Sequence, residues 1–239
     1  MIGSVVRTMP EPKEALTRPA RANSRGSLSI SPELRAQLLE VLLAAPPAAP
    51  VKISYEEFLD RADEDTLAEW VNGEVIMTSP ASKKHQNVAD FLTSVLRPYV
   101  EQREAGVVLS APFQVKLEQG REPDLIFVAQ AHLDRLLENR VEGAPDLVVE
   151  IVSPESVGRD RGEKFNEYER GGVPEYWLID PQVRWAAIYN RDAGGRYQLS
   201  FTGTDGVFRS QVIAGFWLRA EWLWQPPPVV QVLRELKVI

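Results

Sequence analysis

An apolar run that contains one carboxylate constrains this chain more than any other feature. The segment APDLVVEIVSPES (residues 144–156) places Glu150 in the middle of a nearly unbroken apolar stretch from Leu147 to Val152. Such a stretch is typical of a strand that a sheet buries on both faces. An ionised side chain taken out of water without a partner is strongly unfavourable. Glu150 must therefore be protonated, paired with a cation or bound to a metal ion.

A second acid stands at the start of another apolar strand. The segment EPDLIFVA (residues 122–129) places Asp124 directly before Leu125, Ile126, Phe127 and Val128. Two carboxylates on neighbouring strands can share a hard divalent cation, which offsets their mutual repulsion. The pair therefore indicates a site for a hard divalent cation. A structural ion pair for Glu150 and a strand-start role for Asp124 are the simpler alternatives.

Three more polar residues can reach this site. Lys164 lies in a helix that follows the Glu150 strand. A crossover helix usually packs back over the sheet, so its first turns lie beside the carboxyl end of the strand. Glu69 lies in a predicted hairpin, and His85 lies near the start of a long predicted helix. Each of the three, taken alone, is equally typical of an ordinary surface position.

Composition narrows the class of protein. The chain has 239 residues, 44% of them hydrophobic, and it has no cysteine, which excludes disulfides and thiolate chemistry. No apolar stretch approaches the roughly 20 residues of a membrane helix, and the start lacks the apolar core of a signal peptide. We expect a cytoplasmic protein. The net charge of −7 argues against a general basic surface for nucleic acid.

The pattern divides the chain into an N-terminal extension, residues 1–50, and a domain, residues 51–239. The extension contains a short amphipathic helix that begins near Ser31 and a linker, AAPPAAP. The apolar face of that helix would pack on the domain or on a second subunit, as in a homodimer. The tryptophan-rich segment FWLRAEWLW (residues 216–224) is expected to pack on the domain rather than to stack nucleic-acid bases.

Within the domain, helices and strands alternate. Helices are predicted over 54–62, 82–106, 132–140 and 161–172, and strands over 107–117, 122–129, 144–153 and 174–180. Hairpins are predicted at both ends, around Asn72-Gly73 and around residues 193–195. The order predicts an α/β fold with a central mixed sheet flanked by helices.

These segments in this order resemble the Uma-two-type family of restriction-endonuclease-like proteins, which are abundant in cyanobacteria and other bacteria. The resemblance spans about residues 51–224, through SYEEFL, EWVNGEVI, SPASKKHQNVADFL, REPDLIFV, VEGAPDLVVEIVSPES and DRGEKFNEYERGGVPEYWLIDP. It implies the PD-(D/E)XK nuclease fold and divalent-metal-dependent hydrolysis of DNA.

The resemblance also carries over to single residues. Asp124 and Glu150 match the two signature acids, but Val152 stands where the superfamily pattern has lysine. The family moves that lysine to the following helix, at the place of Lys164. Glu69 and His85 match the acid of the opening hairpin and the polar helix residue.

A mechanism follows from these positions. Mg²⁺, or Mn²⁺, would be held by Asp124, Glu150 and the carbonyl of Ile151, and Lys164 would orient the attacking water. Basic residues that flank the site would contact DNA: Lys83, Lys84, Arg159 and Arg161. Two alternatives stay open. One is a catalytically inactive nucleic-acid-binding or interaction module that retains the fold, and the other is a hydrolase of a smaller phosphodiester.

Overall fold

The computed structural model describes residues 31, 52–62, 67–77, 81–153, 158 and 162–239. The expected N-terminal helix lies outside the described residues, apart from Ser31. The N-terminal extension and its boundary at residue 50 therefore stay predictions.

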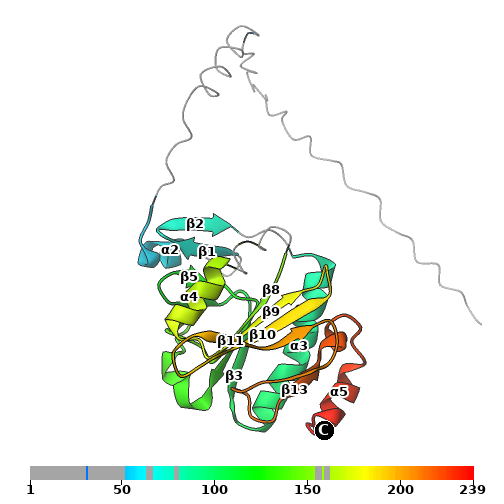
Figure 1. Ribbon diagram of the computed structural model, residues 1–239. Coiled ribbons are helices and arrows are strands. Elements are labelled where there is room, and N and C mark those ends of the chain that lie inside the picture. The colour runs from blue at the N-terminus through cyan, green and yellow to red at the C-terminus, as the bar shows by residue number, and fades with distance from the viewer. Residues whose placement is uncertain (1–30, 32–51, 63–66, 78–80, 154–157, 159–161) are drawn as a thin grey trace, which may run out of the picture. The chain divides into compact units, whose positions relative to one another are not determined.

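Two sheets organise the described chain (Figure 1). The larger has the order β11-β10-β9-β8-β6-β3, with bounds Tyr197–Gly203, Trp185–Arg191, Glu175–Asp180, Leu147–Ile151, Leu125–Ala129 and Gly106–Ser110. The smaller has the order β2-β1-β5-β4-β7, with bounds Glu74–Met77, Ala68–Val71, Gly120–Arg121, Gln114–Lys116 and Arg140–Glu142. A separate hairpin joins β12 (Val207–Arg209) and β13 (Trp217–Arg219). The larger and the smaller sheet are both mixed. Most of their strand pairs are antiparallel, but β8 pairs in parallel with β9, and β4 pairs in parallel with β7.

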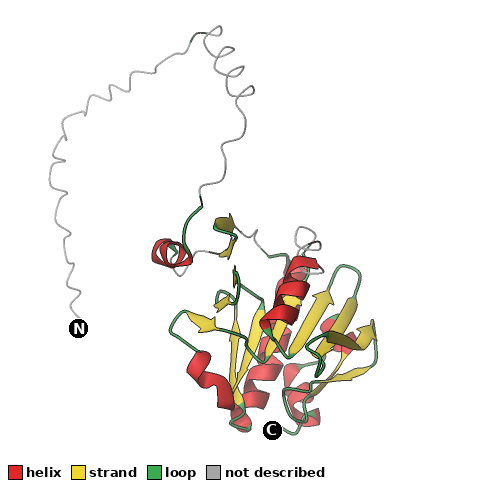
Figure 2. Cartoon of the chain, turned by 60° about the vertical axis from the view of Figure 1, so that its left-hand side comes forward, coloured by secondary structure: helices red, strands yellow, loops and turns green. Residues whose placement is uncertain are grey.

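Helices pack around these strands (Figure 2). The α-helices are α2 (Tyr55–Arg61), α3 (Lys83–Gln102), α4 (Lys164–Gly171) and α5 (Val229–Glu235), and two 3-10 helices are η1 (Gln130–Arg135) and η3 (Ala220–Leu223). This arrangement confirms the predicted α/β fold with a mixed sheet flanked by helices. In the part of the chain that the structure describes, no helix is both long and apolar enough to cross a membrane.

The long helix α3 forms where the sequence predicts it. Ser82 caps its first turn by accepting a hydrogen bond from the backbone N–H of His85 at 3.3 Å. Its buried side chains recur at helical spacing and comprise Val88, Phe91, Leu92, Val95, Leu96, Tyr99 and Val100. They enter a core that also contains side chains from β6, β8 and the C-terminal segments.

Strand β8 is buried on both faces, as its apolar run predicts. Leu147, Val149 and Ile151 join the core that α3 covers, whereas Val148 and Val152 join a second core that contains Tyr168 of α4. Side chains alternate between the faces of a strand. Glu150 therefore lies on the α4 face.

Two predicted elements differ from the structure. The expected strand over 107–117 is divided into β3 and β4, which belong to different sheets. Pro112 lies at the bend between them, where a residue without a backbone N–H cannot continue a ladder. The expected helix over 132–140 is wrong, because only the 3-10 helix η1 forms and Arg140 already begins β7. Parallel pairing of β7 with β4 overrides the local helical pattern.

The C-terminal tryptophans pack on the domain. Trp222 is 8% exposed and belongs to the core that α3 covers. The guanidinium of Arg219 lies 5.7 Å from the ring centroid of Trp222 and 6.0 Å from that of Trp217. These contacts match the expectation of packing rather than base stacking.

The core beneath α3 provides a stability test. Leu92 has no exposed surface, whereas Ser94, two residues further along the helix, is exposed. Leu92→Ala should lower the free energy of unfolding by about 2–5 kcal/mol, because it removes buried methyl groups and leaves a cavity. Ser94→Ala should change it by less than about 0.5 kcal/mol. Chemical denaturation of both variants checks this, and equal effects would contradict the described packing.

Candidate active site

The two strand acids lie next to each other. The register of β6 and β8 pairs Leu125 with Val149, so Asp124 follows this pair toward Glu150. Asp124 Oδ2 accepts a hydrogen bond from the backbone N–H of Ile151 at 2.6 Å. The carboxylate of Asp124 is thereby fixed beside the peptide that links Glu150 to Ile151.

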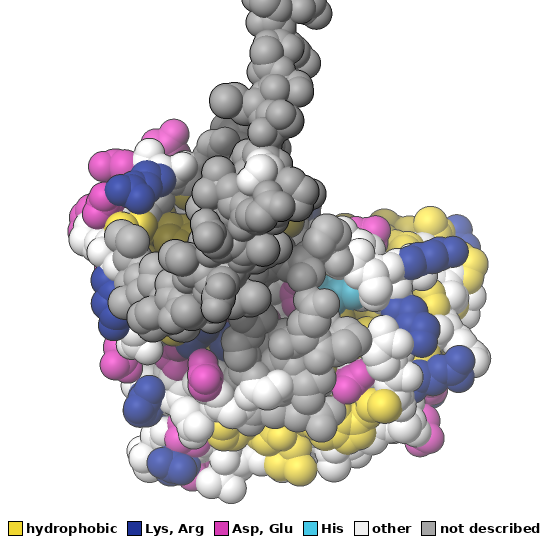
Figure 3. Space-filling view, turned by 90° about the horizontal axis from the view of Figure 1, so that it is seen from above, with side chains coloured by type: hydrophobic (Ala, Val, Ile, Leu, Met, Phe, Trp, Pro, Cys, Tyr) yellow, Lys and Arg dark blue, Asp and Glu magenta, His cyan; other side chains and the backbone are white. Residues whose placement is uncertain are grey.

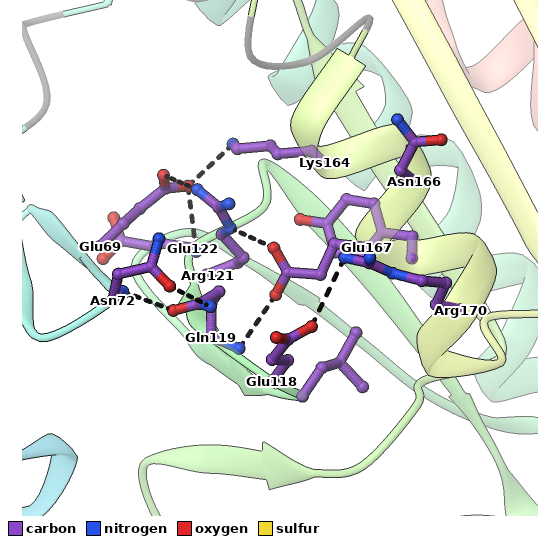
Figure 4. A network of polar contacts seen from close by, with 12 residues as sticks. Glu69, Asn72, Glu118, Gln119, Arg121, Glu122, Lys164, Asn166, Glu167 and Arg170 are labelled. Carbon is purple, nitrogen blue, oxygen red and sulfur yellow. Dashed lines mark hydrogen bonds and ion pairs between the residues drawn. The ribbon is translucent and has the colours of Figure 1, made fainter.

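Lys164 connects Glu150 to the smaller sheet. Its ammonium donates to both oxygens of Glu150, at 3.0 Å and 2.9 Å. The same Nζ lies 2.8 Å from Glu69 Oε1, in strand β1. All three residues are buried, with 5% exposure or less. Figure 4 shows Lys164 extending from α4 toward Glu69.

Arg121 forms the next link in this network (Figure 4). Its Nη1 lies 3.2 Å from Glu69 Oε2, and its Nε lies 2.8 Å from Glu167 Oε2. Burial alone would raise the pKa of Glu69, but the charges and hydrogen bonds of Lys164 and Arg121 outweigh it and lower that pKa. Burial alone would lower the pKa of Arg121, but the carboxylates of Glu167 and Glu69 outweigh burial and raise that pKa. Both groups are therefore charged at neutral pH.

Tyr168 contacts Glu150 from the same helix as Lys164. Its hydroxyl donates to Glu150 Oε1 at 2.7 Å. Complete burial, with the neighbouring carboxylates of Glu150 and Glu69, raises the pKa of Tyr168 well above its ordinary value, so the hydroxyl keeps its proton. Lys164 and Tyr168 are four residues apart and so lie on one face of α4.

Glu122 is a further acid close to this network. The Gln114 side-chain amide donates to Glu122 Oε2 at 3.1 Å. Burial raises the pKa of Glu122 to about 7, and the Glu69 carboxylate adds to the rise, against hydrogen bonds from the Ala68 backbone and Gln114. Its carboxyl group therefore changes charge near neutral pH.

His85 approaches the site from the first turn of α3. Its Nε2 lies 3.1 Å from Asp124 Oδ1. Lys83 and Lys84 are exposed in the same turn, and Lys84 Nζ donates to Gln182 Oε1 at 2.9 Å. On the face in Figure 3, several of the described Lys and Arg side chains gather on the right, whereas those on the left lie among Asp and Glu side chains.

The structure thus brings together all five predicted side chains: Glu69, His85, Asp124, Glu150 and Lys164. Arg159 and Arg161 lie outside the described residues. The sequence analysis missed four residues of the network, namely Arg121, Glu122, Glu167 and Tyr168. Helical spacing from Lys164 was a signal for Glu167 and Tyr168, at positions i+3 and i+4.

The described part of the network carries more negative than positive charge. The carboxylates of Glu69, Glu150 and Glu167 face two cations, Lys164 and Arg121. Asp124 adds a further acid beside them. Among the described residues, no group of three or more His, Asp or Glu side chains is arranged to hold a metal ion by itself.

Comparison with solved structures supports the fold. The chain matches a solved structure from Anabaena variabilis, described as a "putative nuclease belonging to DUF820", with a TM-score of 0.63 and 20% sequence identity. The match covers 72% of this chain and 98% of that one. This chain therefore shares the fold of that protein. No curated protein matches the chain.

A family model gives the closer assignment. Residues 55–221 match the Uma2 family, described as "putative restriction endonuclease". The matched segment is most of the described domain and includes all five predicted site residues. The chain belongs to the Uma2 family.

Arg121 supplies a test of the buried network. Arg121→Met should lower the free energy of unfolding by about 3–5 kcal/mol, because it leaves Glu69 and Glu167 buried without this partner. Arg170→Met is the matched control, since Arg170 and Glu118 form an exposed pair at 3.5 Å and such pairs contribute about 1 kcal/mol or less. Chemical denaturation of both variants measures the difference. A loss in Arg121→Met no larger than in the control would contradict the network.

Glu122 supplies a pH test. Its pKa in the folded protein, about 7, lies above the ordinary value of 4.5. Between these two values the folded state therefore binds more protons at Glu122 than the unfolded state does. The contribution of Glu122 to the free energy of unfolding is fully present below about pH 4.5 and is lost as the pH rises through about 7. Glu122→Gln stays neutral, so its stability relative to wild type should increase between about pH 5 and pH 8. Thermal melts in chelator across this range check the direction, and a constant difference would contradict it.

Proposed function

We propose that this protein is a divalent-metal-dependent endonuclease that hydrolyses DNA phosphodiester bonds. The observation that carries the proposal is the contact of the Lys164 ammonium with Glu150, next to the Asp124 carboxylate. Acids that share one face of a sheet with a fixed ammonium supply the groups that phosphodiester hydrolysis requires. Membership of the Uma2 family supports the same reaction class.

The residues present fit a divalent cation. Mg²⁺ prefers oxygen ligands and needs only one or two carboxylates, with water and substrate phosphate completing its shell. Asp124, Glu150 and the carbonyl of Ile151 would hold it, because the Asp124–Ile151 hydrogen bond brings these groups together. When bound, Mg²⁺ or Mn²⁺ would supply charge for phosphate oxygens and acidify a water molecule.

The roles of the other side chains follow from their contacts. The Lys164 ammonium would orient the attacking water and stabilise negative charge on the phosphate. Glu69 holds Lys164 at 2.8 Å and is itself held by Arg121, so we assign it to positioning Lys164. His85 Nε2 lies at the Asp124 side of the site, where it would contact the scissile phosphate.

DNA is the proposed substrate, with Lys83 and Lys84 beside His85 as backbone contacts, and with Arg159 and Arg161 predicted to join them. A homodimer and a cytoplasmic location also stay predictions. The alternative of an inactive binding module would keep the same fold, so measured metal binding and cleavage must distinguish the two. Fold similarity alone does not establish activity.

Plasmid cleavage tests the proposal. Purified protein should nick or cut supercoiled plasmid DNA with Mg²⁺ or Mn²⁺ and lose this activity in EDTA. Asp124→Asn, Glu150→Gln and Lys164→Met should each reduce the rate at least about 100-fold, because each removes a group that acts on the reacting atoms. These near-isosteric changes preserve side-chain volume.

Two variants serve as matched controls. Asp90 and Lys237 are exposed residues outside the site, so Asp90→Asn and Lys237→Gln should cleave at the wild-type rate. Circular dichroism of each variant checks that it is folded. Equal cleavage by wild type and the three site variants would assign the activity to a contaminant. Metal binding without cleavage of any DNA form would favour the inactive module.

A further inference from the structure

Helix α4 supplies Glu150 with a second donor besides Lys164. The Tyr168 hydroxyl donates to Glu150 Oε1 at 2.7 Å, on the oxygen that also accepts from Lys164 at 3.0 Å. Glu150 is 3% exposed and Tyr168 has no exposed surface. The hydrogen bond is thus shielded from water, which strengthens its hold on the carboxylate.

The ring of Tyr168 is fixed by its surroundings. It lies against Tyr176 of β9, with the ring centroids 5.4 Å apart, in the second core beneath α4. The ring of Tyr176 in turn lies near those of Phe165 and Tyr197, with ring centroids 6.2 Å and 6.0 Å apart. A hydroxyl on a packed ring has little freedom to move, so it can set the rotation of the carboxylate that it contacts.

A neutral donor is suited to a carboxylate that must hold a cation. The ammonium of Lys164 compensates negative charge at Glu150, whereas a tyrosine hydroxyl satisfies an oxygen lone pair without adding positive charge. Glu150 can therefore be oriented by Tyr168 and still keep its charge for a metal ion. Groups that orient metal ligands in this way strongly affect metal affinity.

We propose that Tyr168 is a positioning residue that holds the Glu150 carboxylate in the orientation required for divalent-metal binding. This inference rests on the proposed function, because it assigns Glu150 as a metal ligand. Tyr168 acts through Glu150 and does not contact the substrate. The role requires only the hydroxyl, since the ring alone maintains the packing under α4.

Tyr168→Phe tests the proposal, with Tyr197→Phe as its matched control. Tyr197 belongs to the same aromatic core, but its hydroxyl donates to the carbonyl of Val173 at 3.0 Å. Both variants therefore lose one buried hydroxyl, and only one of them loses a contact with Glu150. Isothermal titration with Mn²⁺ should show affinity weaker by about 10-fold or more in Tyr168→Phe, and unchanged affinity in Tyr197→Phe.

Cleavage provides a second readout. The Mn²⁺ concentration for half-maximal plasmid cleavage should rise about 10-fold or more in Tyr168→Phe, while saturating Mn²⁺ should restore a rate near wild type. Equal Mn²⁺ affinities in wild type and Tyr168→Phe would overturn the proposal. A loss of affinity of similar size in Tyr197→Phe would overturn it too, because the effect would then come from the aromatic core in general.

The same titration separates this inference from the proposed function. Wild-type protein that binds no Mn²⁺, or that binds it as well as Glu150→Gln does, contradicts the assignment of Glu150 as a ligand. Wild-type binding that depends on Glu150 and is unaffected by Tyr168→Phe contradicts only the positioning role.

Discussion

The site depends on one buried ammonium that contacts carboxylates from two sheets. Lys164, at the start of α4, joins Glu150 of the larger sheet to Glu69 of the smaller sheet. Each carboxylate is almost fully buried, and neither tolerates ionisation there without a positive partner. The Lys164 ammonium between them therefore makes the docking of the opening hairpin, the larger sheet and α4 mutually dependent.

This arrangement explains why polar residues surround the ammonium instead of apolar ones. A buried ion pair is often no more stabilising than apolar residues of similar size. Arg121 and Glu167 extend the network, so that further buried charges must be compensated. Among the described side chains of this network, acids outnumber cations, which is hard to explain by stability alone. It is consistent with a site that retains negative charge for a ligand.

The sequence predicted those features that depend on local pattern. The nearly unbroken apolar run around Glu150 identified a doubly buried strand, and the helical spacing from Val88 to Tyr99 identified α3. The smaller sheet was only partly predictable. Strand β5 has two residues, Gly120 and Arg121, and enters the sheet by pairing with the nearby β4 and with Trp70 of β1, which is distant in sequence.

The site was predictable to a similar extent. Acids in apolar strands stand out because their burial requires an explanation, so Asp124 and Glu150 could be identified without a structure. Arg121 looks like an ordinary loop residue in QGREPD, and only the fold shows that it lies between Glu69 and Glu167. Pairing across 46 or more residues leaves no periodic trace in a single sequence.

The position of the lysine has a structural consequence. Residues two apart in a strand point to the same face, so a lysine at position 152 would reach the site from the strand itself. Here Val152 fills that place and packs with Tyr168 in the core beneath α4. The ammonium comes instead from α4, one helical turn before Tyr168. Moving the lysine to the helix thus places the charged donor and the neutral donor of Glu150 on one rigid element, so that any shift of α4 displaces both together.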